Sequence, residues 1–231
     1  MSGVCLYKSR ITNKKLNLGS SFNLSKGSNF NLSKSIGFSK VRIGLGWNPN
    51  ETKNGPAFDL DVSAFGIDSS YKIINDSYFI FYGQVKAGNA KEDPIRKGFY
   101  RPTTDDGAVM GAIDDPTGLS SDGDDDEDMI IDLLKVHPQV EQIIICASIS
   151  KYPHDNFKDV RTLSLDFGKV SDCYIRIINE SNGIEIAKYE LTDQYSTQDA
   201  IEFGRLYRID NEWQFEAMGR GHSGSLQALV D

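Results

Sequence analysis

Short runs of apolar residues, many alternating with polar ones, recur along the chain and are separated by turn residues. Alternation is typical of a strand with one buried face, and a continuous apolar run of four to eight residues is typical of a buried strand. The turn signal Asn182-Gly183 and the segment 210–212 each predict a β-hairpin. The runs that we interpret as strands are 41–47, 58–65, 78–82, 108–113, 142–149, 173–178, 184–189, 206–209 and 213–218. Many short strands predict an all-β fold, an antiparallel β-sandwich.

Helix signals are few. Residues 196–199 have the residue types of a helix cap, so we expect one short helix at Ala200 and Ile201. Residues 135–141 are expected to hold a turn around Pro138, and 84–108 are rich in Gly and Pro and predict a long excursion. The sequence of 22–26 is repeated at 30–34, which predicts a hairpin or tandem edge strands.

The segment 114–128 is the most unusual part of the chain, because eight of its fifteen residues are carboxylates. No Lys or Arg occurs between Arg101 and Lys135. Unit charges 4 Å apart interact by about 4 kcal/mol at a surface-like dielectric, so these side chains repel when folded together. Either the segment is a solvated acidic run, or a cation lies among the carboxylates. Gly118 and Gly123 allow the segment to turn, and calcium takes six to eight oxygen ligands from such loops.

Two features favour the cation. The apolar run 129–134 follows directly, so the acidic segment is anchored to a core. In 58–65, strand alternation places Asp59, Asp61 and Ser63 on one face. Two carboxylates on one strand face, with no basic residue nearby in sequence, indicate a metal site.

Charge and length set the domain organisation. The chain has 231 residues and a net charge of -8, and outside the acidic segment 25 acids balance 25 bases, so the acidity is local. The first 50 residues contain eight basic residues and no acid. We predict a basic arm or linker at 1–23 and one domain at 24–231. The basic residues are scattered and lack aromatic neighbours, so we expect no nucleic-acid partner, while association with a membrane surface stays open.

Cysteine use and hydropathy indicate the compartment. Cys5, Cys146 and Cys173 form no CxxC motif, so neither a disulfide framework nor a zinc site is indicated. There is no apolar leader and no apolar run of 18 residues. We expect a soluble, cytoplasmic protein.

The chain resembles the TerD family of tellurite-resistance and stress-response proteins from about Leu24 onward. Each motif is weak alone, but their order and spacing are specific. The motifs that carry the resemblance are Leu24-Ser25-Lys26-Gly27, Gly44-Leu45-Gly46-Trp47, Phe58-Asp59-Leu60-Asp61-Val62-Ser63-Ala64-Phe65, Asp106-Gly107, Asp115-Pro116-Thr117-Gly118, the Asp-Asp-Glu of the acidic segment, Phe167-Gly168-Lys169-Val170, Tyr174-Ile175-Arg176, Phe203-Gly204-Arg205-Leu206-Tyr207-Arg208 and Glu212-Trp213-Gln214-Phe215.

This resemblance implies a β-sandwich that binds calcium, usually two ions, through the strand at 59–61 and the acidic loop. It implies a non-enzymatic binding module whose partners are other stress-response proteins, including those of the same tellurite-resistance system. The family commonly has Asp-Asn where this chain has Asp114-Asp115, and Asp122 is an addition. Which of Asp124, Asp125 and Asp126 face the metal is therefore open. The ligand candidates are Asp59, Asp61, Asp106, Asp114, Asp115, Thr117, Gly118, Asp122, Asp124, Asp125, Asp126 and Glu127.

Two other function classes are alternatives to a calcium-binding module. A metal-dependent hydrolase needs an activated water and a general acid or base. Of the three histidines, His137 and His154 lie in expected loops, and His222 in its Gly-rich setting is the candidate to follow. A small-ligand binder of the cyclic-nucleotide type is the other alternative, although no nucleotide pocket is identified in the sequence.

Overall fold

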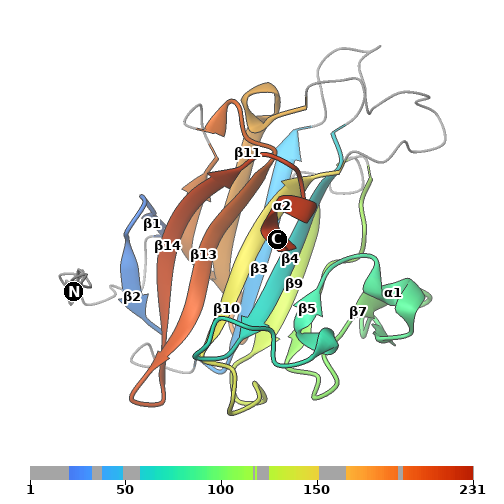
Figure 1. Cartoon of the computed structure of the whole chain (residues 1–231), viewed down its shortest axis with the longest axis vertical. Coiled ribbons are helices and arrows are strands. Elements are labelled where there is room, and N and C mark those ends of the chain that lie inside the picture. The colour runs from blue at the N-terminus through green and yellow to red at the C-terminus, as the bar shows by residue number, and fades with distance from the viewer. Residues whose placement is uncertain are drawn as a thin grey trace, which may run out of the picture.

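In the part of the chain that the structure describes, strands dominate and form two six-stranded sheets that lie face to face (Figure 1). The computed structural model describes residues 21–32, 38–48, 58–116, 118, 125–150, 165–191 and 195–230. Sheet A has the order β1 (Phe22–Asn23), β12 (Ile184–Glu190), β11 (Ser171–Asn179), β3 (Lys40–Asn48), β9 (Glu127–Asp132) and β8 (Val109–Met110). The all-β sandwich predicted from the strand pattern is confirmed.

Sheet B carries the strand that matters most for the candidate site. Its order is β2 (Asn29–Asn31), β14 (Glu212–His222), β13 (Ala200–Ile209), β10 (Gln142–Ile149), β4 (Leu60–Ile67) and β5 (Phe79–Ile80). All of its neighbouring strands are antiparallel. Since β5 pairs only with Ala64 and Phe65, the first half of β4 lacks a strand partner on that side within the described residues.

A small third sheet and four short helical turns complete the described residues. Strands β6 (Ala90–Glu92) and β7 (Tyr100–Pro102) pair with each other inside the long excursion predicted at 84–108. The helical turns are α1 (Gln84–Ala87), α2 (Gln227–Val230), η1 (Asp76–Tyr78) and η3 (Phe167–Lys169). In Figure 1, α2 lies in front of sheet B. None of the helices of the described ranges is long and apolar enough to cross a membrane.

Both sheets contribute their inward side chains to one core. Ile43 and Ile175 of sheet A and Ile145 and Phe203 of sheet B belong to the same buried apolar cluster. On β10 the odd-numbered residues 143–149 join this cluster, and the even-numbered ones point to the other face. The alternation in the sequence therefore distinguishes the side chains that point into the sandwich from those on its outer face.

The described part of each copy of the repeat at 22–26 and 30–34 contributes to an edge strand, one on each sheet. β1 pairs in parallel with β12, and β2 pairs antiparallel with β14. The sheet thus begins at Phe22, two residues before the expected boundary at Leu24, and residues 1–20 of the expected arm lie outside the described residues. Both hairpin predictions, around 182–183 and 210–212, are confirmed by the pairings of β11 with β12 and β13 with β14.

The helix expected at Ala200 is wrong, because β13 begins there. Pairing with β10 on one side and β14 on the other outweighs the local cap signal. The carboxylate of Asp199 accepts hydrogen bonds from Gly224 N and Ser225 N at 2.7 Å instead of capping a helix. The strands expected at 78–82 and 108–113 are only two residues long, and 135–141 form turns, as predicted.

The glycines of the Gly44-Leu45-Gly46-Trp47 motif are required by close approach. A Cβ at Gly44 would lie 2.1 Å from the carboxylate of Asp125, and one at Gly46 would lie 2.4 Å from the ring of Tyr174. The outer face of β3 therefore accommodates side chains from the acidic segment and from β11. Leu45, between these glycines, and Trp47, after them, both belong to the buried core.

Candidate metal centre

Asp59 directly precedes strand β4 and Asp61 is its second residue, so the two carboxylates lie close together. The side chains of Asp59, Asp61 and Ser63 point to one face of the sheet, and Leu60 and Val62 point into the core. The sequence alone predicts this alternation but not that the two carboxylates are buried. In the structure Asp59 and Asp61 are only 5% and 3% exposed. Two buried carboxylates on one face are costly unless a positive charge compensates them.

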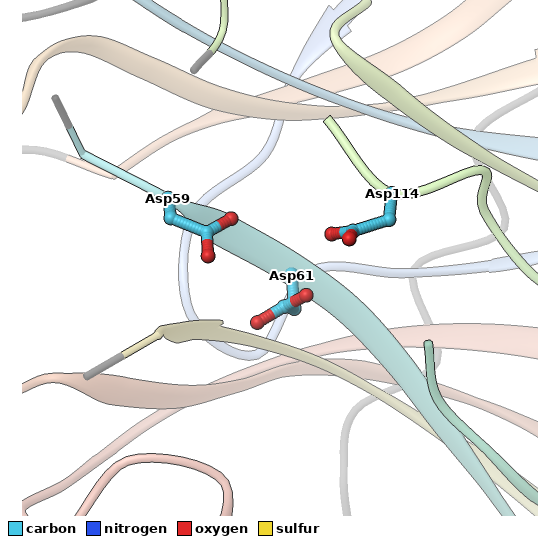
Figure 2. Close-up of side chains that lie close together, drawn as sticks. All are labelled: Asp59, Asp61 and Asp114. Carbon is cyan, nitrogen blue, oxygen red and sulfur yellow. The ribbon is translucent and has the colours of Figure 1, made fainter. Parts of the chain in front are cut away.

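Asp114 brings a third carboxylate to the pair. One oxygen from each of Asp59, Asp61 and Asp114 lies within 4.8 Å of the others. Figure 2 shows Asp114 on a neighbouring segment, with its carboxylate directed toward those of Asp59 and Asp61. Asp114 is exposed, so the group reaches solvent on that side. Oxygens within this separation are close enough for a single hard cation to contact all three.

Glu127 joins the acidic segment to β4 from the interior. At the start of β9 it is 2% exposed, and its Oε2 accepts a hydrogen bond from Val62 N at 2.8 Å. Its Oε1 accepts from Asp115 N at 3.4 Å. The carboxylate thus takes the position of a strand partner at the open half of β4. It fixes the segment of Asp114 and Asp115 beside Asp61.

The electrostatics of this region favour protons or cations. Burial, followed by the charges of Asp59 and Asp114, raises the pKa of Asp61 well above its ordinary value. Burial, followed by the charge of Asp61, raises the pKa of Glu127 in the same way. Within the described ranges, no Lys or Arg forms an ion pair with either residue. Charge compensation from a bound cation would lower both pKa values.

Other carboxylates of the acidic segment are compensated by arginines that come from elsewhere in the chain. Arg176 on β11 donates from Nε and Nη2 to the two oxygens of Asp125, at 2.6 and 2.9 Å. Arg101 and Arg96 each donate to Asp128 Oδ1, at 2.8 and 3.0 Å. These pairs turn Asp125 and Asp128 toward arginines rather than toward β4.

Asp126 and Gly118 are both organised by Trp47. Trp47 N donates to Asp126 Oδ2 at 2.8 Å, and its indole Nε1 donates to the Phe58 carbonyl at 3.1 Å. Gly118 has a φ of 61°, and a Cβ there would lie 2.5 Å from the indole nitrogen. Trp47 therefore contacts Phe58, the residue before Asp59, and two points of the acidic segment. The sequence shows Trp47 only as part of a motif, so its positioning role was missed.

Of the remaining ligand candidates, two lie in the described residues and three lie outside them. Asp106 lies outside the three-carboxylate group and accepts hydrogen bonds from Tyr78 Oη at 2.6 Å, Thr104 Oγ1 at 2.7 Å and Ala108 N at 2.9 Å. Asp115 is buried next to Glu127 through its backbone N–H. Thr117, Asp122 and Asp124 lie outside the described residues. The ligand roles of all five stay predictions.

The histidines of the described ranges lie away from this group. The pairings of four adjacent strands place His222 in line with Asp61. Asp61 on β4 pairs with Ser148 on β10, Ser148 pairs with Ala200 on β13, and Ala200 pairs with His222 on β14. Three strand spacings separate His222 from Asp61, or about 14 Å. His222 Nε2 instead contacts Glu202 Oε1 at 2.8 Å. His137 accepts from Gln139 N, and His154 lies outside the described residues.

The donor set decides which ions fit. Every candidate atom in the group is a carboxylate oxygen, two from buried side chains and one from an exposed side chain. Hard cations such as calcium and magnesium prefer oxygen, whereas zinc and copper prefer sites with imidazole or thiolate. The residues present therefore fit a hard divalent cation.

Comparison with known proteins gives the relationship of the chain. Residues 21–231 match the model of the TerD domain. The chain is 39% identical over 214 residues to the tellurium resistance protein TerD of Serratia marcescens, with 93% of each chain covered. It is 34% identical over 194 residues to general stress protein 16U of Bacillus subtilis, covering 84% of this chain and 86% of that protein. A solved homologue of telluride resistance protein from Streptomyces coelicolor has a TM-score of 0.56 at 18% identity, covers 83% of this chain and 94% of that chain, and supports the fold alone.

Proposed function

The chain belongs to the TerD domain family, and on that premise we propose that it is a calcium-binding protein of tellurium resistance and stress response. The names of the Serratia marcescens and Bacillus subtilis relatives support the physiological setting. The observation that carries the proposal is the convergence of Asp59, Asp61 and Asp114 within 4.8 Å. Its action is binding rather than catalysis.

Calcium suits this group better than magnesium. Asp61 lies in β4, Asp59 directly before it and Asp114 on a separate segment, so the oxygens are not held in one tight frame. Magnesium requires a near-ideal octahedron and retains its waters, whereas calcium accepts six to eight oxygens in flexible geometry. A second ion would draw on acidic residues of 115–127, several of which lie outside the described ranges.

Bound calcium would act by fixing the acidic segment against sheet B. Glu127 already bonds this segment to β4 through Val62 N, and the ion would add a second connection through Asp114. The ordered segment would then present a surface to other stress-response proteins, including those of the same tellurite-resistance system. The partner role rests on the family relationship.

Isothermal titration of EDTA-treated protein with calcium tests this function. Asp61→Asn is expected to weaken binding by at least about tenfold, which corresponds to about 1.4 kcal/mol. Asp210→Asn is the matched control, because it removes the same charge from the exposed turn between β13 and β14. Its affinity should equal that of the wild type. The proposal fails if the wild type binds no calcium, or if Asp61→Asn binds as tightly as the control.

A further inference from the structure

Two serines on the same sheet face as Asp61 have buried hydroxyl groups whose hydrogen bonding is unsatisfied. Ser63 and Ser148 are both 0% exposed. Neither Oγ has a hydrogen-bond partner within the part of the chain that the structure describes. A buried hydroxyl without a partner loses its bonds to water and gains nothing in return. Such a group in a native protein is usually completed by an ordered water or a bound ion.

The strand register places Ser148 next to the three-carboxylate group. In the antiparallel pairing of β10 with β4, Ser148 is directly opposite Asp61, and Cys146 is opposite Ser63. Residues directly opposite each other point to the same face, with their β-carbons about 4.5–5.5 Å apart. Ser148 is therefore level with Asp61. Ser63 lies two residues beyond Asp61 along β4, on the side away from Asp59.

The ion proposed for this group needs more oxygens than its three carboxylates guarantee. Calcium takes six to eight, and three carboxylates supply three to six depending on how many bind through both oxygens. Glu127 would add a fourth negative charge, and each of its two oxygens already accepts one hydrogen bond, from Val62 N and from Asp115 N. A serine hydroxyl is a neutral oxygen donor that adds no further negative charge.

We propose that Ser148 Oγ is a ligand of the cation held by Asp59, Asp61 and Asp114. This inference rests on the function proposed above and adds a residue from a second strand to the site. Ligation by Ser148 would join β10 to β4 through the ion. It also explains why a polar side chain is present at a position that is fully buried.

The test uses Ser148→Ala, with Ser63→Ala as the matched control. Both variants remove a fully buried hydroxyl without a partner from the same sheet face, and only Ser148 is level with Asp61. In calcium titrations of EDTA-treated protein, Ser148→Ala should lose about fivefold in affinity, or about 1 kcal/mol. Ser63→Ala should stay within about twofold of the wild type.

Two further measurements separate ligation from a structural role. In EDTA, the urea midpoint of Ser148→Ala should not fall below that of the wild type, because the hydroxyl makes no bond to lose. With europium in place of calcium, luminescence lifetimes in H₂O and D₂O should report about one additional bound water in Ser148→Ala, since water replaces the lost ligand.

The inference is wrong if Ser148→Ala binds calcium as tightly as the wild type, or if Ser63→Ala loses as much affinity. A lowered midpoint in EDTA with unchanged europium hydration would also contradict it, because that result describes a structural serine. Absence of calcium binding by the wild type would instead overturn the proposed function itself, so the two failures are distinguishable.

Discussion

The guanidinium of Arg101 donates to Asp128 twice, to its carboxylate at 2.8 Å and to its carbonyl at 2.7 Å. The same side chain donates to the Gly111 carbonyl at 2.9 Å and to the Asp93 carboxylate. Gly111 and Asp128 flank the segment that carries Asp114 and Glu127. Arg101, which is 3% exposed, therefore holds both ends of the acidic segment together.

We predict that Arg101→Met lowers the free energy of unfolding by about 3–5 kcal/mol, because it leaves Asp93 and Asp128 without their buried partner. Urea denaturation in EDTA measures the loss. Arg220→Met is the control, since Arg220 forms an exposed pair with Glu202 at 3.4 Å and should change stability by at most about 1 kcal/mol. Equal losses in the two variants would show that Arg101 acts as an ordinary surface charge.

Substitution of Asp125 tests whether this carboxylate has a structural role or is a metal ligand. The sequence proposes it as a metal ligand, but Arg176 engages both of its oxygens. We expect Asp125→Asn to lose about 1–3 kcal/mol of stability, as for hydrogen bonds between charged groups. Its calcium affinity should stay within about twofold of the wild type by isothermal titration. A tenfold loss of affinity would place Asp125 at the ion after all.

The local parts of this site could be read from the sequence. The period-two pattern at 58–65 predicts that Asp59 and Asp61 share a face, because side-chain alternation is a property of the strand itself. The hairpins and the sandwich follow from patterns that are equally local. Asp114 was named from a family motif rather than from geometry.

The pairing of the acidic segment with arginines could not be predicted from local sequence patterns. Arg176 is 51 residues from Asp125 along the chain, and the pair exists only because β11 lies next to β3 and the acidic segment crosses Gly44. The repulsion expected from the absence of Lys and Arg within the segment is therefore too large, because arginines from elsewhere in the chain compensate part of its charge. Ser148 was likewise hidden, since only the register of β10 with β4 places it opposite Asp61.

Acid stability should depend on Asp93. Burial alone would raise the pKa of Asp93, but hydrogen bonds from the Arg101 side chain and from Arg96 N and Ile95 N outweigh it and lower the pKa to about 2. Because the folded pKa lies below the ordinary 3.8, this stabilisation is fully present above pH 4, roughly, and is lost as the pH falls through about 2. The loss amounts to about 2–3 kcal/mol.

Urea denaturation between about pH 4 and 2, in EDTA, measures this contribution. Asp93→Asn should be less stable at the upper end of the range and should show a shallower fall in stability toward the lower end. Asp210→Asn, which changes an exposed turn residue, should keep the slope of the wild type. The same slope in Asp93→Asn would contradict the assignment.

Thermal unfolding of EDTA-treated protein with calcium, with magnesium and with sodium chloride at matched ionic strength tests the metal centre most directly. Calcium that binds only the folded protein at 100 times its Kd stabilises it by about 2.7 kcal/mol. For a domain of this size the melting temperature should rise by very roughly 5–10 °C. Magnesium should do less, and sodium chloride least, because screening softens repulsion without binding to the carboxylates of Asp59, Asp61 and Asp114. Equal shifts with calcium and with sodium chloride would mean that these carboxylates form only an acidic cluster and no calcium site.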